Sequence, residues 1–229
     1  MTLQMNDLDR CESAPVLGAH TEAEKNFPAL YRDFGKRALD LTVVFLLLPI
    51  ILPLILIFCA LIALDGHSPI YMQNRVGRGG RIFRMYKLRT MIPDAKAGLS
   101  KYLAENPSAM LEWELKQKLS NDPRITVVGR ILRSSSLDEL PQLLNVLKGD
   151  MSLIGPRPMM IEQMPMYPGS AYYHLRPGVT GTWQVSDRNN SSFAGRAPFD
   201  TSYHRDLSLW VDIRVLFQTA LVVIRRTGC

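Results

Sequence analysis

Two adjacent acids, Asp138 and Glu139, are the side chains of this sequence best placed to do chemistry. Pro141 follows them, and because proline is tolerated in a helix only near its first turn, a helix is predicted to begin close to Asp138. The amino end of a helix binds phosphate readily, and a carboxylate there stays ionised, as a nucleophile must. The simpler interpretation is a helix cap, in which Asp138 accepts backbone N–H groups.

A single arginine lies between two prolines in the sequence Gly-Pro-Arg-Pro at positions 155–158. Each proline fixes its own φ and pushes the preceding residue towards extended geometry, so the backbone around Arg157 is expected to be rigid. A guanidinium held in this way suits bidentate recognition of a phosphate, whereas the alternative is a structural turn with a solvated arginine. Further cations are expected near the acids: Lys87, Arg89, Arg130 and Arg133.

Together these residue types match phosphoryl transfer, which needs cations to spread charge, acids to hold magnesium and one placed nucleophile. Asp138 and Glu139 would supply the oxygen ligands that Mg²⁺ prefers. A two-carboxylate glycosidase fits less well, because adjacent acids on one turn do not flank a sugar ring at about 5–9 Å. The cysteines and histidines are scattered along the chain, which predicts neither a disulfide framework nor a zinc site.

One apolar segment, residues 41–64, has no charged side chain and is long enough to cross a bilayer as a straight helix. Pro49 and Pro53 disfavour a straight helix near its middle. Basic side chains, which prefer the cytoplasm, flank it on both sides: Lys25, Arg32, Lys36 and Arg37 before it, and Arg75, Arg78, Arg81 and Arg84 after it. We therefore predict a helix–break–helix hairpin that enters and leaves by one face. The alternatives are a proline-kinked spanning helix and a buried helix of a soluble core.

The segment that follows predicts a β-hairpin. Residues 70–91 form two extended runs around the turn-forming sequence Gly-Arg-Gly-Gly at 77–80. Alternate residues of a strand point to one face, so Lys87 and Arg89 are expected to project together as a cationic patch.

Helices are predicted in two later segments. Residues 94–119 are expected to be largely helical, with a break at Asn106-Pro107. Residues 209–226 carry apolar side chains at helical spacing and end in two arginines, which suits the carboxyl end of a helix. This C-terminal helix would either pack on the core or lie on the membrane surface.

The net charge of +6 and the pI near 9.3 indicate an anionic partner: nucleic acid, anionic lipid or a phosphorylated substrate. No nucleic-acid reader motif is recognisable, and the charge-free run argues against this class. A non-catalytic alternative is a peripheral membrane protein. In that case the basic stretch 75–89 would bind anionic lipid electrostatically, and the acidic pair would only cap a helix.

Several ordered blocks resemble the bacterial sugar transferase family, the monotopic polyprenyl-phosphate hexose-1-phosphate transferases, over roughly residues 33–224. The resemblance is strong because many blocks occur in order. The blocks are Lys36-Arg37 with Asp40, Tyr86-Lys87-Leu88-Arg89-Thr90-Met91, Asn121-Asp122-Pro123-Arg124-Ile125-Thr126, Ser136-Leu137-Asp138-Glu139-Leu140-Pro141-Gln142, Gly149-Asp150-Met151-Ser152-Leu153-Ile154-Gly155-Pro156-Arg157-Pro158, Arg176-Pro177-Gly178-Val179-Thr180-Gly181 and Trp183-Gln184-Val185-Ser186.

The resemblance implies a specific reaction. In this family the aspartate of the acidic pair attacks the β-phosphorus of a UDP-sugar, which releases UMP and leaves a phosphosugar on the enzyme. A lipid phosphate, usually undecaprenyl phosphate, then accepts the phosphosugar. By this resemblance Asp138 is the nucleophile, and Glu139 is its partner and a ligand of Mg²⁺ together with Asp138. The implied phosphate contacts are Lys87, Arg89, Arg133 and Arg157.

The resemblance also implies a mixed, helix-rich α/β fold with a small sheet and amphipathic interfacial helices. We divide the chain into a mobile tail (1–30), a membrane-anchoring re-entrant hairpin (31–66) and a cytosolic catalytic domain (67–229) at the bacterial inner membrane. Asp187 stands where the family usually has glycine after Trp-Gln-Val-Ser, and the following residues resemble the exopolysaccharide-initiating branch, which moves galactose or glucose 1-phosphate. The sugar used and any self-association to a homo-oligomer are left open by the sequence.

Overall fold

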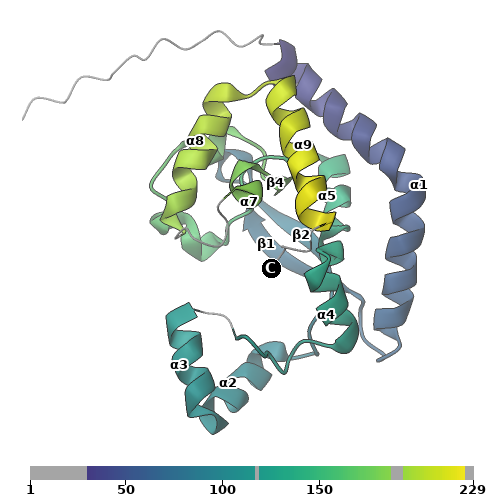
Figure 1. Ribbon diagram of the computed structural model, residues 1–229, viewed down its shortest axis with the longest axis vertical. Coiled ribbons are helices and arrows are strands. Elements are labelled where there is room, and N and C mark those ends of the chain that lie inside the picture. Colours follow the sequence, from purple (N-terminus) through teal and green to yellow (C-terminus); the bar gives the residue numbers. More distant parts are fainter. Residues whose placement is uncertain (1–29, 117–118, 187–192, 225–229) are drawn as a thin grey trace, which may run out of the picture.

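The computed structural model describes residues 30–116, 119–186 and 193–224. The tail expected at 1–30 therefore lies outside the described residues except for its last position, and so does Asp187. The described chain is rich in helices, with small sheets at its centre (Figure 1). Its elements are α1 (Lys36–Ala63), β1 (Ile70–Val76), β2 (Ile82–Leu88), α2 (Ala95–Glu105), α3 (Pro107–Lys116), α4 (Val127–Ser134), α5 (Gln142–Lys148), β3 (Ser152–Ile154), α6 (Ala171–His174), β4 (Gly178–Thr180), α7 (Thr182–Val185), α8 (Ala197–Asp206) and α9 (Leu209–Ile224).

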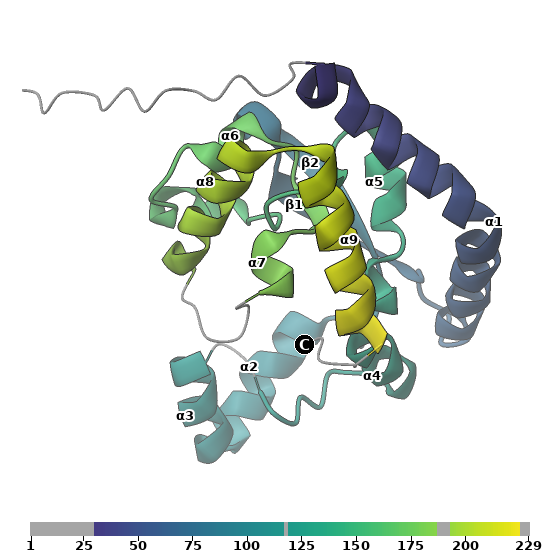
Figure 2. The same ribbon diagram turned by 45° about the horizontal axis from the view of Figure 1, so that its top comes forward.

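Helix α1 contains all of the predicted membrane segment except its last residue, Leu64. The helix continues without interruption through Pro49 and Pro53, so the predicted break between two helices is not present. Instead, the helix bends along its length (Figure 2). Together with the turn before it, Tyr31–Ala63 is apolar and long enough to cross a membrane, and only 6% of its most apolar stretch is buried. That exposure argues against a helix in a soluble core.

Both ends of α1 contact the rest of the protein. Near its start, Val44 is completely buried in the main hydrophobic core. Near its end, Ile62 packs with Leu88 of β2 and Leu132 of α4 in a separate cluster. The bent helix therefore returns to the same body that it leaves, while the side chains of its middle, such as Ile50 at 71% exposure, face outward.

Buried charges attach the start of α1 to later parts of the chain. The Lys36 ammonium lies 2.8 Å from the Asp212 carboxylate of α9. Asp40 accepts hydrogen bonds from the Ser152 hydroxyl and the Leu153 backbone N–H, each at 3.0 Å. All five residues are buried, which strengthens these contacts and makes an unpaired member costly.

The predicted β-hairpin is confirmed. Strands β1 and β2 pair antiparallel from Ile70 opposite Leu88 to Val76 opposite Ile82. Gly79 and Gly80 lie between them with φ of 66° and 76°, a left-handed conformation that glycine adopts without steric cost. A second, parallel pair joins β3 to β4, and it supports the loop that carries the Gly-Pro-Arg-Pro sequence.

The two predicted helical segments are also confirmed. The segment 94–119 folds as α2 and α3, which separate at Asn106 as expected before a proline. Helix α9 buries Val215 in the core, yet Trp210 is 78% and Phe217 66% exposed. It therefore packs on the core along one edge and presents apolar side chains outward along another, so the expected core packing is confirmed and contact with the membrane surface stays a prediction.

Candidate active site

The acidic pair lies in a short 3₁₀ turn, Leu137–Glu139, and not at the amino end of α5. Ser136 precedes the turn with φ 57°, and Pro141, which has no N–H, separates the turn from α5. Helix α5 therefore begins at Gln142, later than the sequence predicted. The prediction that the acids open a helix was wrong, because the left-handed residue and the proline fold this segment as a separate turn.

Strand β2 carries Lys87 to the acids. The Lys87 ammonium lies 2.8 Å from a Glu139 carboxylate oxygen and 4.0 Å from one of Asp138. Buried Asn145 of α5 fixes this arrangement, since its amide accepts from the Tyr86 N–H at 3.1 Å and donates to the Arg84 carbonyl at 2.7 Å. These hydrogen bonds fix α5, which follows the acidic turn, against strand β2, which carries Lys87.

Two opposing effects act on the Asp138 carboxyl group. Burial, the largest effect, raises its pKa, the positive charge of Lys87 lowers it, the Glu139 carboxylate raises it, and Arg133 lowers it to a smaller extent. The pKa of Asp138 is raised overall, and the two cations limit this rise. Arg133 is held nearby by a hydrogen bond from its Nε to the Thr90 hydroxyl at 2.9 Å. The cations, and not a helix terminus, therefore favour the ionised form that a nucleophile needs.

Arg89, predicted beside Lys87, is directed elsewhere. Its Nη2 lies 2.6 Å from an Asp65 carboxylate oxygen, and its Nε donates to the Ser68 carbonyl at 2.8 Å. Strand β2 ends at Leu88, so the alternation that would have placed the two cations on one face does not extend to Arg89. The structure gathers Lys87, Arg133 and the acids, and it uses Arg89 to bind the loop after α1.

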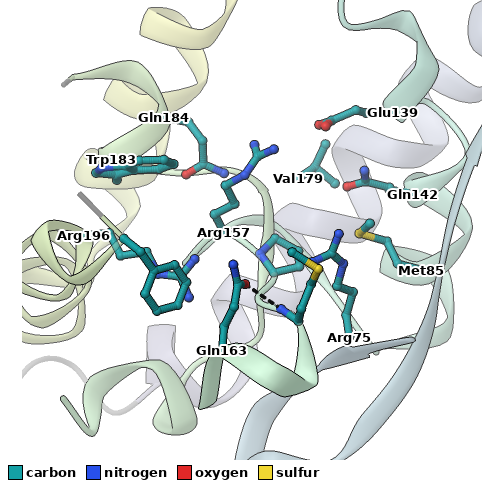
Figure 3. Close-up of a pocket in the computed structure, with 13 residues that line it drawn as sticks. Arg75, Met85, Glu139, Gln142, Arg157, Gln163, Val179, Trp183, Gln184 and Arg196 are labelled. Atoms are coloured by element: carbon teal, nitrogen blue, oxygen red, sulfur yellow. Dashed lines mark hydrogen bonds between the residues drawn. The ribbon is translucent and has the colours of Figure 1, made fainter. Parts of the chain in front are cut away.

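Arg157 lies in the middle of a cavity of about 340 Å³, with Glu139 and Gln142 on one side and Trp183 and Gln184 on the other (Figure 3). Its guanidinium makes no hydrogen bond or ion pair with any other described residue. Glu139 lines this cavity, and Asp138 precedes it in the same turn, 4.0 Å from Lys87. The cavity is lined by Arg75, Met85, Glu139, Gln142, Arg157, Pro158, Met160, Gln163, Val179, Trp183, Gln184, Phe193 and Arg196. We call it the arginine cavity.

The loop that presents Arg157 depends on a close backbone approach. A Cβ atom at Gly155 would lie 2.3 Å from the Arg176 carbonyl oxygen, so only glycine fits where this loop passes the start of β4. The prolines beside Arg157 then fix the chain direction, as the sequence indicated. The rigid backbone of the loop thus fixes the position of Arg157, and its guanidinium remains available to a ligand.

Several lining groups lack partners within the described part of the chain. They are the Nε of Arg75, the Nε and Nη2 of Arg196, and both amide atoms of Gln184. Burial lowers the pKa of Arg75 and of Arg196, and the charge of Arg157 lowers both further. Buried donors without partners are costly, so convergence of several on one cavity indicates an anionic ligand with many acceptor oxygens, such as a diphosphate.

Arg75 and Arg196 were missed as site residues by sequence reasoning. Arg75 was noted only as a basic flank of the membrane segment, and Arg196 belongs to no recognised block. Gln184 was quoted within Trp-Gln-Val-Ser but given no role. Only the tertiary fold brings these three side chains to Arg157, because they come from β1, the turn before α8 and α7.

Asp138 and Glu139 are the residues expected to bind Mg²⁺. Among the described residues no group of three or more His, Cys, Asp and Glu side chains gathers as a metal site. Mg²⁺ is commonly held by one or two carboxylates, with substrate phosphates and water completing its shell. Asp138 and Glu139 fit that mode, provided that the phosphates of a substrate supply further oxygens.

Comparisons with known proteins identify the family of this chain. A family model described as bacterial sugar transferase matches residues 31–226. The undecaprenyl-phosphate galactose phosphotransferase of Salmonella typhimurium is 47% identical over 85% of this chain, which spans 41% of that relative. The UDP-galactose-lipid carrier transferase of Erwinia amylovora is 45% identical, again over 41% of the relative's length.

A shorter relative matches along most of both chains. The exopolysaccharide production protein ExoY of Rhizobium meliloti is 42% identical over 85% of this chain and 87% of its own length. This chain thus spans about two fifths of the first two relatives and nearly all of the third. Since the family model covers both the acidic turn and the arginine cavity, the chain belongs to the bacterial sugar transferase family.

Proposed function

We propose that the protein moves hexose 1-phosphate, of the galactose or glucose type, from a UDP-sugar to undecaprenyl phosphate and releases UMP. This would be the first membrane step of exopolysaccharide assembly, at the cytoplasmic face of the bacterial inner membrane. The names of the relatives support the acceptor and the pathway class. The observation that carries the proposal is an acidic pair held beside a cavity in which buried nitrogen atoms of Arg75 and Arg196 have no hydrogen-bond partner among the described residues.

In this proposal the arginine cavity binds the diphosphate of the donor. Arg157, with its fixed backbone, contacts the phosphate nearest Glu139, and Arg75 and Arg196, on opposite sides of the cavity, offset the remaining charge. The Gln184 amide supplies both a donor and an acceptor to the bound nucleotide sugar. Binding would satisfy the polar groups that otherwise lack partners.

The first step is attack by a carboxylate oxygen of Asp138 on the β-phosphorus. A bond forms between that oxygen and phosphorus, and the bond from phosphorus to the bridging oxygen breaks, so UMP leaves with the electron pair. Lys87 keeps Asp138 ionised before attack, and Arg157 offsets charge on the transferring phosphoryl oxygens. Mg²⁺ bound by Glu139 and Asp138 would supply further neutralisation of phosphate charge.

In the second step a phosphate oxygen of the lipid acceptor attacks the same phosphorus. The bond from phosphorus to Asp138 breaks, and the carboxylate is regenerated next to Lys87. The product carries the sugar on a lipid diphosphate. Glu139, paired with Lys87 at 2.8 Å, lies close enough to position the acceptor.

The membrane arrangement is also a proposal. A re-entrant α1, which dips into the bilayer and returns, is supported by its bend, its outward apolar side chains and the attachment of both its ends to the same domain. The attachment would keep the acids at headgroup depth, where the acceptor phosphate lies. The cytosolic nucleotide sugar could then approach from the water side.

The proposal is tested by measuring the nucleotide released. Purified protein in lipid membranes is expected to release UMP from UDP-galactose or UDP-glucose when undecaprenyl phosphate and Mg²⁺ are present. Without acceptor, release should stop at one UMP per enzyme, because the phosphosugar stays on Asp138, and chelation of Mg²⁺ should suppress the reaction. Release of UDP would mean transfer of sugar alone. Salt-sensitive membrane binding with no UMP would favour the non-catalytic alternative.

A second expectation concerns pH. Only the ionised Asp138 attacks, so the rate of UMP release should fall as pH falls through the pKa of this group. Lys87 lowers that pKa against the effect of burial, and Lys87→Met is therefore expected to move the acid limb of the pH–rate profile to higher pH. Lys148→Met is the control, since exposed Lys148 binds the Tyr86 hydroxyl instead. Identical acid limbs for the Lys87 variant and wild type would contradict this role.

A further inference from the structure

A second cavity, also of about 340 Å³, opens between α1 and α9 above α5. Its walls are almost entirely apolar, in contrast to the arginine cavity. Thr180 and Thr219, two of its few polar side chains, hydrogen-bond to each other at 2.7 Å. The cavity is lined by Leu47, Ile51, Ser136, Glu139, Leu140, Leu143, Leu153, Arg157, Val179, Thr180, Gln184, Val185, Leu216, Thr219 and Val222. We call it the apolar groove.

The two cavities meet at the proposed reaction centre. Glu139, Arg157 and Gln184 line both of them. One end of the apolar groove therefore presents a carboxylate and a guanidinium, while the rest of its length offers hydrocarbon side chains. A ligand that matches this surface has a small anionic head joined to a long apolar tail.

The outer surroundings of the groove indicate where such a ligand comes from. The two helices that form its sides carry large apolar groups on their exposed faces: Leu46 and Ile50 on α1 are 72% and 71% exposed, and Phe217 on α9 is 66% exposed. Contiguous exposed apolar surface of this kind is characteristic of contact with lipid. The groove thus lies between two helices whose exposed faces are suited to contact with lipid.

We propose that the apolar groove binds the head-proximal isoprene units of the polyprenyl phosphate acceptor, with the acceptor phosphate at Arg157. This inference rests on the proposed function and assigns the acceptor a place distinct from that of the nucleotide. Donor and acceptor phosphates would both use Arg157, since it borders both cavities. They would therefore occupy it in turn, first the donor diphosphate and then, after UMP has left, the lipid phosphate.

The groove can be filled by substitution without touching the acids. Ile51→Trp on α1 and Leu216→Trp on α9 are each expected to raise the KM for undecaprenyl phosphate at least about tenfold, because an indole would occupy volume needed by the lipid tail. The acceptor-independent release of one UMP per enzyme should be unchanged, since it uses only the arginine cavity. The matched controls are their neighbours on the lipid-facing side, Ile50→Trp and Phe217→Trp, which should keep the wild-type KM.

The outcomes separate this inference from the proposed function. A wild-type KM in both groove variants, with UMP release intact, would overturn the groove assignment and leave the proposed function standing. Absence of UMP release from the wild-type protein would overturn both. Loss of acceptor-independent UMP release in one groove variant would reveal misfolding of that variant, and the substitution on the other helix then decides the question.

Discussion

Asp138→Asn is expected to reduce UMP release by on the order of 10³-fold or more, the largest effect of any single substitution proposed for this protein. The amide has nearly the same shape as the carboxyl group but lacks the anionic oxygen that would bond to phosphorus. Folding should be preserved, because Lys87 keeps its closer contact, 2.8 Å, with Glu139. Turnover and the amount of labelled phosphosugar bound to protein after a single donor addition measure the effect.

The control for this substitution is Asp150→Asn. Asp150 lies at the other end of α5, where it accepts a hydrogen bond from Asn145 at 3.4 Å, and it borders neither the arginine cavity nor the apolar groove. Its variant should retain turnover close to wild type. Near-normal turnover in Asp138→Asn, or an undiminished labelled adduct, would remove Asp138 as the nucleophile. A requirement for both substrates to be bound together would likewise reject a covalent intermediate.

Arg157→Ala is expected to lower kcat by roughly 10²-fold, the range found when one preorganised charge-stabilising donor is removed. Arg157 stands in the middle of the cavity, with Glu139 on one side and Arg196 on the other, and its loop fixes it for a bidentate contact that alanine cannot make. Arg157→Lys should recover only part of the rate, because an ammonium lacks the planar pair of donors. Steady-state kinetics with donor and acceptor varied separately measure both variants.

Arg81→Ala serves as the matched arginine control. Arg81 is exposed beside the turn between β1 and β2 and lies outside both cavities, so its loss should leave kcat unchanged. An unaltered kcat for Arg157→Ala would exclude Arg157 from the reaction centre. A rise in KM for the donor alone, without a change in kcat, would instead assign it to ground-state binding.

The parts of the fold that sequence predicted well are those that local chemistry determines. Glycines at 77–80 set the β-hairpin, and Asn106-Pro107 separates α2 from α3 for reasons that lie within a few residues. The family resemblance supplied the roles of the acids, which no local pattern could distinguish from a helix cap.

The parts that sequence missed depend on tertiary contacts or on where an element ends. Arg89 followed Lys87 in the predicted strand, but the strand stops at Leu88 and Arg89 turns to Asp65. Arg75 and Arg196 reach the cavity only through folding of distant segments. Pro49 and Pro53 predicted a break in the apolar segment, whereas α1 continues through both residues and bends.

The buried attachment of α1 has a consequence for the order of events during synthesis. The ribosome completes α1 long before Ser152 and Asp212, to which Asp40 and Lys36 bind. In the membrane arrangement proposed above, α1 would enter the lipid as it is made, before Ser152 and Asp212 are available as partners. Within the described part of the chain, Lys36 gains its partner Asp212 only after α9 has been synthesised, so this buried ion pair between α1 and α9 forms late in the folding of the domain.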